Sequence, residues 1–277
     1  MPVAGRFRYL EALPHAVSSA ATRPGGRAGQ LHGTLVLIHG FPLTARMWEP
    51  QLELAEHGWR VIVPQLRGFD GPPADEVATS VDDYAGDVID LLDALHIEQA
   101  VIGGLSMGGY ITFAVFRRAA RYFRGLILAD TRAQPDTPEG VEGRLRMLQL
   151  VRERGAAAAA DEMLPRLIGA STRASRPDVE QTLRDLILSN STATIAGAIT
   201  ALMNRPDATP LLPTIHCPTL VVVGDEDVIT PPAASEAITR GIAGAELAIV
   251  PRAGHMSNME QPAAFNLTLA RFLDHRV

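Results

Sequence analysis

The chain alternates short, wholly apolar runs with longer amphipathic stretches, and this alternation limits its fold more than any other feature. Apolar runs between turn signals are typical of strands buried on both faces, and the amphipathic stretches are typical of helices that cover a mostly parallel sheet. We predict six such strands, at residues 34–38, 60–63, 100–102, 126–128, 220–223 and 247–250. Helices are predicted at residues 81–95, 109–120 and 262–275, and an antiparallel edge strand at residues 6–10. The predicted fold class is therefore α/β, with helices on both faces of a mostly parallel central sheet.

The alternation stops after Asp130. Residues 131–213 contain no strand-like run, and their alanine tract at 156–160 favours a helix. We predict an inserted helical lid at residues 131–213, with residues 1–130 and 214–277 forming the core. A helical subdomain with only a stabilising role is the alternative.

The composition excludes several classes of protein. Of the 277 residues, 47% are hydrophobic and 20% are charged, which is typical of a globular protein with a large core. A formal net charge of −6 offers no basic surface to nucleic acid. The single cysteine, Cys217, excludes an intrachain disulfide, and no cluster of His, Asp and Glu has the spacing of metal ligands, so we expect neither metal nor cofactor. No apolar run is long enough to cross a bilayer or resembles a secretion signal, and we therefore expect a soluble, cytoplasmic protein without a membrane partner.

The strongest local signal is the run Gly104-Leu105-Ser106-Met107-Gly108-Gly109, which lies directly after a predicted strand and directly before a predicted helix. A serine at such a sharp turn adopts a strained backbone geometry that packs only when its neighbours are glycines. The turn exposes the hydroxyl at the sheet edge and directs the positive end of the helix dipole toward the reacting centre. We therefore predict that Ser106 is a nucleophile, with a glycine-rich structural turn as the alternative.

A serine hydroxyl is a poor nucleophile near neutral pH unless a base accepts its proton, so a histidine and an orienting carboxylate are expected later in the chain. Acidic residues 225–227 follow the predicted strand at 220–223. Of the eight histidines, His255 alone follows the last predicted strand, beside a glycine and ahead of the final helix. Because the C-terminal ends of parallel strands meet at one edge of a sheet, we expect both groups beside Ser106.

These motifs, together with His39-Gly40-Phe41-Pro42, resemble those of the α/β-hydrolase superfamily, and the resemblance extends over the whole chain. It implies an α/β-hydrolase fold in which Asp227, three residues after the glycine that ends its strand, is the catalytic acid. Asp130, after the preceding strand, is the alternative acid. The resemblance also implies that His39 shapes the oxyanion loop and does not transfer protons.

Acyl transfer further requires two backbone N–H donors that stabilise the oxyanion. In this superfamily the residue after the nucleophile supplies one donor, here Met107, and the loop after the first parallel strand supplies the other. Phe41 is the expected second donor, because Pro42 has no N–H. We also expect the side chains of Phe41 and Met107 to line the acyl-binding pocket. Gln65 and Asp70 depart from the aspartate and the glycine-X-glycine turn that relatives often carry, so the loop near them is expected to differ in shape.

Within the superfamily, residues 105–109 and 224–262 resemble small carboxylesterases and 3-oxoadipate enol-lactonase-like enzymes. We therefore expect a serine hydrolase that cleaves a carboxylic ester of a small substrate through an acyl-enzyme intermediate, with Ser106, Asp227 and His255 as its catalytic triad. Hydrolysis of an enol-lactone, the activity of cofactor-free haloperoxidases or perhydrolases, and hydrolysis of a carbon–carbon bond are alternatives. A ligand receptor with slow turnover is an alternative of a different class.

The motifs serve the chemistry and leave the substrate open, so we expect the insertion to select the substrate. Three of its arginines are candidates for binding a substrate carboxylate: Arg132, Arg144 and Arg146. Solvated helix charges are the alternative for each.

Overall fold

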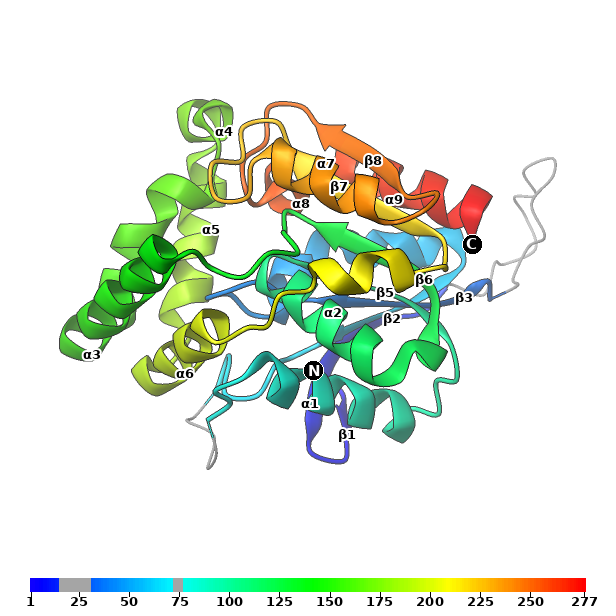
Figure 1. Ribbon diagram of the computed structural model, residues 1–277, viewed down its shortest axis with the longest axis horizontal. Helices are drawn as coiled ribbons and strands as arrows, with labels where there is room; N and C mark the ends of the chain where they lie inside the picture. The colour runs from blue at the N-terminus through cyan, green and yellow to red at the C-terminus, as the bar shows by residue number, and fades with distance from the viewer. Residues whose placement is uncertain (15–30, 72–76) are drawn as a thin grey trace.

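The computed structural model describes residues 1–14, 31–71 and 77–277 and has an eight-stranded sheet at its centre (Figure 1). The strand order is β1-β2-β4-β3-β5-β6-β7-β8. β2 is antiparallel to both of its neighbours, and all pairs from β4 to β8 are parallel. The strands are β1 (Val3–Ala4), β2 (Phe7–Ala12), β3 (Gly33–Ile38), β4 (Trp59–Pro64), β5 (Ala100–Leu105), β6 (Phe123–Ala129), β7 (Thr219–Gly224) and β8 (Glu246–Val250).

The six predicted parallel strands are confirmed, and so is the α/β-hydrolase fold class. The prediction for residues 6–10 was wrong in one respect. The strand there is antiparallel as expected, but it is not the edge, because β1 pairs with it on the outside. The sequence predicts no secretion signal in the N-terminal segment, and residues 15–30 of that segment lie outside the described residues.

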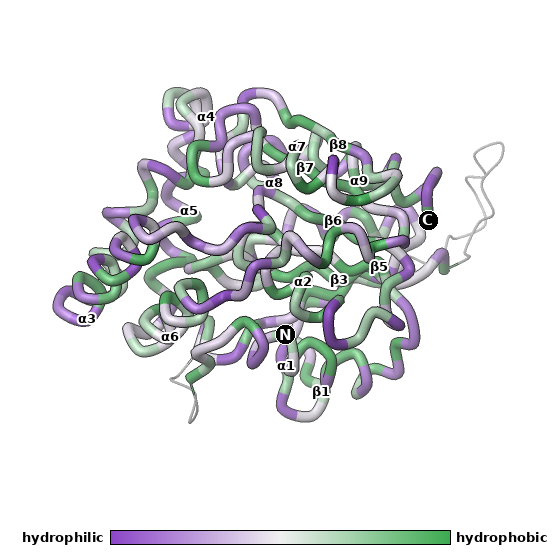
Figure 2. Tube along the Cα trace, in the orientation of Figure 1, coloured by the Kyte–Doolittle hydropathy of each residue, from purple (hydrophilic) through white to green (hydrophobic). Residues whose placement is uncertain are grey.

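Helices cover both faces of the sheet. In Figure 1, α1 (Val81–Ala94), α2 (Met107–Ala119) and α7 (Pro232–Gly241) lie in front of it, and the 3-10 helix η1 (Ala45–His57) and α9 (Pro262–Arg276) lie behind. Three further short helices are η2 (Ala120–Tyr122), η3 (Thr209–Thr214) and α8 (Ser257–Glu260). Figure 2 shows hydrophobic residues along the central strands, whereas hydrophilic residues are frequent in outer helices such as α3. The core therefore lies between the sheet and the two helical layers.

Four further helices lie between β6 and β7, within the predicted insertion, and gather on one side of the sheet (Figure 1). They are α3 (Pro138–Leu167), α4 (Ala170–Ser175), α5 (Pro177–Leu188) and α6 (Thr192–Met203). The alanine tract is helical as predicted and directly follows Gly155, whose φ of 74° and ψ of −166° interrupt α3. Among the described helices, none alone has the length and apolar composition of a membrane span. Only α5 and α6 together meet those criteria, and they are bent by 98° relative to each other.

Loops that follow the strands hold this group of helices over the C-terminal edge of the sheet. Asn190, between α5 and α6, donates from Nδ2 to the carbonyl of Pro42 after β3 (2.8 Å) and accepts the N–H of Asp70 after β4 (2.9 Å). The N–H of Ser171 in α4 donates to the Glu226 carboxylate after β7 (2.8 Å). Asp70, one of the two departures from the family pattern, thus takes part in attaching the helices. Their role as a lid and the exact core boundaries stay predictions.

Candidate active site

Ser106 lies at the predicted strand-to-helix turn, between β5 and α2, with φ of 56° and ψ of −112°. Its N–H donates to the carbonyl of Ala129 at the end of β6 (2.9 Å), so the turn is fixed to the neighbouring strand. A Cβ on Gly104 would lie 2.2 Å from the carbonyl carbon of Gly108, and a Cβ on Gly108 would lie 2.1 Å from the carbonyl oxygen of Ile38. Since such separations leave no room for a side chain, the turn forms only with glycine at both positions.

Ser106 is also accessible. Residues 100–116 are all buried except Ser106, which is half-buried. Met107 is the first residue of α2, where backbone N–H groups have no preceding carbonyl within the helix to bind. The side chain of Ser106 therefore lies beside the first N–H groups of α2 and is partly exposed.

The loop after β3 packs directly against this turn. A Cβ on Gly40 would lie 3.6 Å from Cβ of Ser106. His39 donates from Nδ1 to the Gly40 carbonyl (3.2 Å) and accepts the N–H of Leu66 at Nε2 (3.2 Å). Burial lowers the pKa of His39 to about 4, against the opposing effect of its bond to Gly40. His39 is thus an uncharged imidazole that fixes the loop carrying Phe41. Phe41 in this loop and Met107, which follows Ser106 in the chain, are both buried.

Asp227 and His255 form a buried pair, with His255 Nδ1 2.8 Å from Asp227 Oδ2. Thr230 completes the arrangement: its hydroxyl donates to the same Oδ2 (2.7 Å) and lies 3.2 Å from His255 Nδ1. Asp227 Oδ1 accepts the N–H groups of Ile229 (2.8 Å) and Thr230 (3.0 Å). Burial by itself raises the pKa of Asp227, but the charge of His255 and the hydrogen bonds from His255 and Thr230 outweigh it, so the pKa is lowered. The carboxylate is held ionised and in one orientation.

Asp130, the alternative acid, makes different contacts. Its carboxylate accepts the N–H of Gly224 at Oδ1 (2.9 Å) and the hydroxyl of Ser257 at Oδ2. Burial and the nearby charge of Asp227 raise the pKa of Asp130 well above its usual range. Since His255 hydrogen-bonds to Asp227, the geometry favours Asp227 as the acid.

The nucleophile turn and the histidine loop meet through the end of β6. Thr131 donates from its hydroxyl to the Ser106 carbonyl (2.9 Å), and Ser257, two residues after His255, binds the adjacent Asp130. β5, β6, β7 and β8 are consecutive parallel strands. The three residues predicted from sequence are therefore delivered to one edge of the sheet.

Comparison with known proteins identifies the family. Residues 35–266 match the alpha/beta hydrolase family. The chain belongs to this family. The hydrolase is 29% identical to 3-oxoadipate enol-lactonase 2 of Acinetobacter baylyi, over 92% of this chain and 90% of that relative.

Two solved structures are similar along nearly the whole chain. A thermophilic esterase from Thermogutta terrifontis, in a malate-bound structure, is 37% identical with a TM-score of 0.87, over 97% of this hydrolase and 93% of that chain. The enol-lactonase from Burkholderia xenovorans LB400 is 28% identical with a TM-score of 0.83, over 97% of this hydrolase and 96% of that chain. The comparisons thus show that the protein is a hydrolase, and they do not identify the bond that it cleaves.

The candidate carboxylate-binding arginines have partners inside the hydrolase. Arg132 and Arg144 both pair with Asp136, whose side chain is 2% exposed, at 2.5 Å and 3.1 Å. Arg205, from the segment after α6, pairs with the same carboxylate at 2.8 Å. Arg146 pairs instead with Glu142 on an exposed face of α3. The first two are therefore not simply solvated helix charges.

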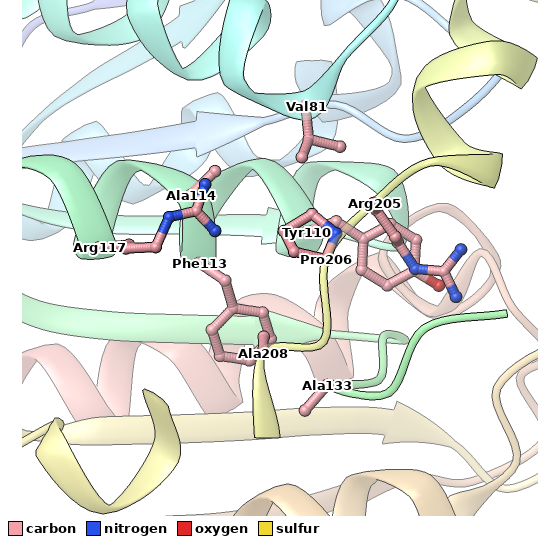
Figure 3. A pocket seen from close by; sticks show the side chains of 9 residues that line it. All are labelled: Val81, Tyr110, Phe113, Ala114, Arg117, Ala133, Arg205, Pro206 and Ala208. Atoms are coloured by element: carbon pink, nitrogen blue, oxygen red, sulfur yellow. The ribbon is translucent and has the colours of Figure 1, made fainter. Parts of the chain in front are cut away.

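The cluster around Asp136 lies where the inserted segment begins and ends. The Arg205 guanidinium lies over the ring of Tyr110, 4.4 Å from its centroid, and the two residues line a small pocket on the outer side of α2 (Figure 3). The N–H of Ala208 donates to the carbonyl of Ala133 (2.9 Å). The start and the end of the insertion thus lie side by side, and none of the triad candidates lines this pocket.

Sequence reasoning missed two residues of this site, Thr230 and Glu260. Thr230 stands in a loop without a recognisable motif. Glu260 follows His255 by five residues, and the residues between them form no motif that would indicate a role for it. Within the described part of the chain, no group of three or more His, Cys, Asp or Glu is arranged to hold a metal ion.

Proposed function

We propose that this hydrolase cleaves carboxylic esters of small substrates, with Ser106 as nucleophile, His255 as general base and Asp227 as orienting acid. One observation carries the proposal: a half-buried serine on a strained turn shares a sheet edge with a buried His255–Asp227 pair at 2.8 Å. A serine needs such a pair to become nucleophilic near neutral pH. A purely structural role would not require a serine at this position of the turn.

The proposed reaction proceeds in two halves. Ser106 Oγ attacks the ester carbonyl while His255 Nε2 accepts its proton, and the carbonyl oxygen gains negative charge that the N–H groups of Phe41 and Met107 stabilise. His255 then protonates the leaving alcohol, and the carbon–oxygen bond of the ester breaks. In the second half, His255 takes a proton from water, the water attacks the acyl-enzyme, and Ser106 recovers its proton as the acid product leaves.

Lactones are the second candidate substrate class. A lactone is an internal ester, so the same residues serve both reactions, and two of the relatives are enol-lactonases. The esterase from Thermogutta terrifontis supports the simple ester as first candidate, because it has the higher identity and TM-score. We assign α3 to α6 the role of a lid, because they are attached to the loops after β3, β4 and β7.

Steady-state hydrolysis of p-nitrophenyl esters, from acetate to decanoate, tests the proposal, with an enol-lactone and a simple lactone measured in parallel. Ser106→Ala is expected to lower kcat by at least about 10⁴-fold, because the attacking atom is absent. Ser175→Ala, on the exposed face of α4, is the matched control and is expected to keep full activity. Multiple turnover of esters that Ser106→Ala abolishes supports the proposal. If the folded wild type turns over lactones only, lactones replace esters as the proposed substrate class. A single slow acylation without turnover would indicate a receptor.

A further inference from the structure

Glu260 is a buried carboxylate next to the proposed catalytic histidine. It ends α8, five residues after His255, and only 1% of its surface is exposed. Its Oε1 accepts the N–H of Gly254 (2.9 Å) and the N–H of Met256 (3.1 Å). These are the residues directly before and after His255, so one oxygen atom fixes the backbone on both sides of the imidazole.

The second oxygen of Glu260 binds the inserted helices. Oε2 accepts the N–H of Gly169, in the turn between α3 and α4 (2.8 Å). The two backbones touch at this point, because a Cβ on Gly254 would lie 2.3 Å from the nitrogen of Gly169. The same carboxylate therefore joins the histidine loop to the insertion, with glycine on both sides of the contact.

Hydrogen bonds from N–H groups to an ionised carboxylate are stronger than those between neutral groups, and burial strengthens them further. The partner at Nδ1, Asp227, sets the tautomer of His255 and the rotation of its ring, but it does not fix the Cα from which the ring projects. In the described structure Glu260 does so, through both flanking peptide groups. A misplacement of about 1 Å in a catalytic group can cost about 100-fold in rate.

We propose that Glu260 is a positioning residue that sets the backbone of His255 through the peptide groups on both sides of it. The inference rests on the proposed function, since it assigns Glu260 a role through His255. Glu260 does not contact the reacting atoms. Its effect is on the fraction of molecules in which His255 is placed to accept the proton of Ser106.

Glu226 provides a matched control. Its carboxylate binds the same part of the insertion, through the N–H of Ser171 (2.8 Å) and the Ser171 hydroxyl. The N–H groups on either side of His255 bind Glu260 instead. A Glu226→Gln variant therefore loosens the attachment of α4 and leaves the histidine loop intact.

The experiment compares Glu260→Met, Glu260→Gln and Glu226→Gln with the wild type, using the best p-nitrophenyl ester. Methionine keeps the length of the side chain and removes both acceptors. Glutamine keeps the shape: its amide oxygen can take the place of Oε1 and accept both flanking N–H groups, while its NH2 group opposes the N–H of Gly169. Glu260→Gln provides the test if Glu260→Met does not fold. Glu260→Met is expected to lower kcat by about 10- to 100-fold with KM within about twofold, because Glu260 is buried. Glu260→Gln is expected to lower kcat less, by about 3- to 10-fold, because a neutral amide oxygen binds the two N–H groups more weakly than a carboxylate does. Glu226→Gln is expected to keep kcat within about twofold of the wild-type value.

A second measurement separates positioning from general destabilisation. The downfield proton resonance of His255 Nδ1–H reports its hydrogen bond to Asp227, and it is recorded at a temperature where each variant is folded. The resonance is expected to shift or broaden in the Glu260 variants and to stay in place in Glu226→Gln. Folded Glu260 variants with wild-type kcat and an unchanged resonance would overturn the inference, as would an equal loss of kcat in Glu226→Gln. If the wild type hydrolyses no ester, the proposed function fails, whereas the resonance still decides the role of Glu260.

Discussion

Replacing Asp227 by asparagine tests the identity of the acid, and the structure determines how the new side chain must lie. Asp227 Oδ1 accepts two backbone N–H groups, from Ile229 and Thr230. The amide oxygen of an asparagine has to take that place, because its NH2 group would oppose both donors. The NH2 group is then forced to face Nδ1 of His255, 2.8 Å away in the wild type.

An NH2 group at this position requires Nδ1 to act as an acceptor, so the single proton of the neutral imidazole moves to Nε2. Nε2 is the atom that has to accept the proton of Ser106, and in this tautomer it cannot do so. A wrong tautomer of this kind lowers kcat by about 10⁴-fold in serine proteases. That factor corresponds to about 5 kcal/mol of transition-state stabilisation. KM is expected to change little, because Asp227 is buried behind His255.

The assay is kcat and KM on the preferred p-nitrophenyl ester, with the midpoint of thermal unfolding as a control for folding. Asp130→Asn is the matched comparison. Its amide oxygen can accept the N–H of Gly224 and its NH2 group can donate to the Ser257 hydroxyl, so the local hydrogen bonds survive. We expect that variant to keep kcat within about tenfold of wild type. A loss of kcat below tenfold in Asp227→Asn would refute the reasoning. A loss in Asp130→Asn that exceeds the loss in Asp227→Asn would identify Asp130 as the acid.

Two further predictions concern stability. Gly104→Ala is expected to lower the free energy of unfolding by at least about 3 kcal/mol, because the new Cβ would overlap the backbone of Gly108 at 2.2 Å. Gly143→Ala in α3, where the nearest atom is 3.8 Å away, is expected to raise it by about 0.5–1 kcal/mol. Urea unfolding of the two variants measures both changes. Asp136 has its pKa lowered to about 2, because Arg205 and its neighbouring arginines outweigh the effect of burial. Its contribution is therefore fully present above about pH 4, the value in an unfolded chain, and is lost as the pH falls toward 2. Asp136→Asn is expected to lower the free energy of unfolding by about 2 kcal/mol at pH 7, with the difference from wild type shrinking below pH 4; a difference that does not change with pH would contradict this assignment.

The strands could be predicted from the sequence because burial on both faces leaves uninterrupted apolar runs. Their exact ends could not. β5 continues through Gly103 and Gly104, residues that interrupt an apolar pattern but lie in register with Ile127 and Leu128 of β6. β1 has two residues, too few for any periodicity, and so the edge of the sheet was assigned to its neighbour.

The candidate site was predictable where its chemistry is encoded in neighbouring residues. Ser106, Asp227 and His255 each follow a strand, and their order along the chain restricts the choice. Thr230 and Glu260 were not predictable, because their roles depend on contacts that form only after folding. Gly169 and Glu260, for example, are 91 residues apart in sequence and hydrogen-bonded in space.

The ion pair between Asp136 and Arg205 and the hydrogen bond between Ala133 and Ala208 hold the two ends of the insertion together. The chain leaves the sheet after β6 and returns, with its two ends in contact, to β7, which pairs directly with β6. Segments whose termini lie this close can be exchanged without altering the scaffold that carries them. We therefore expect that the inserted helices can be exchanged as one continuous piece of chain, provided that the replacement keeps the N–H group that Glu260 binds.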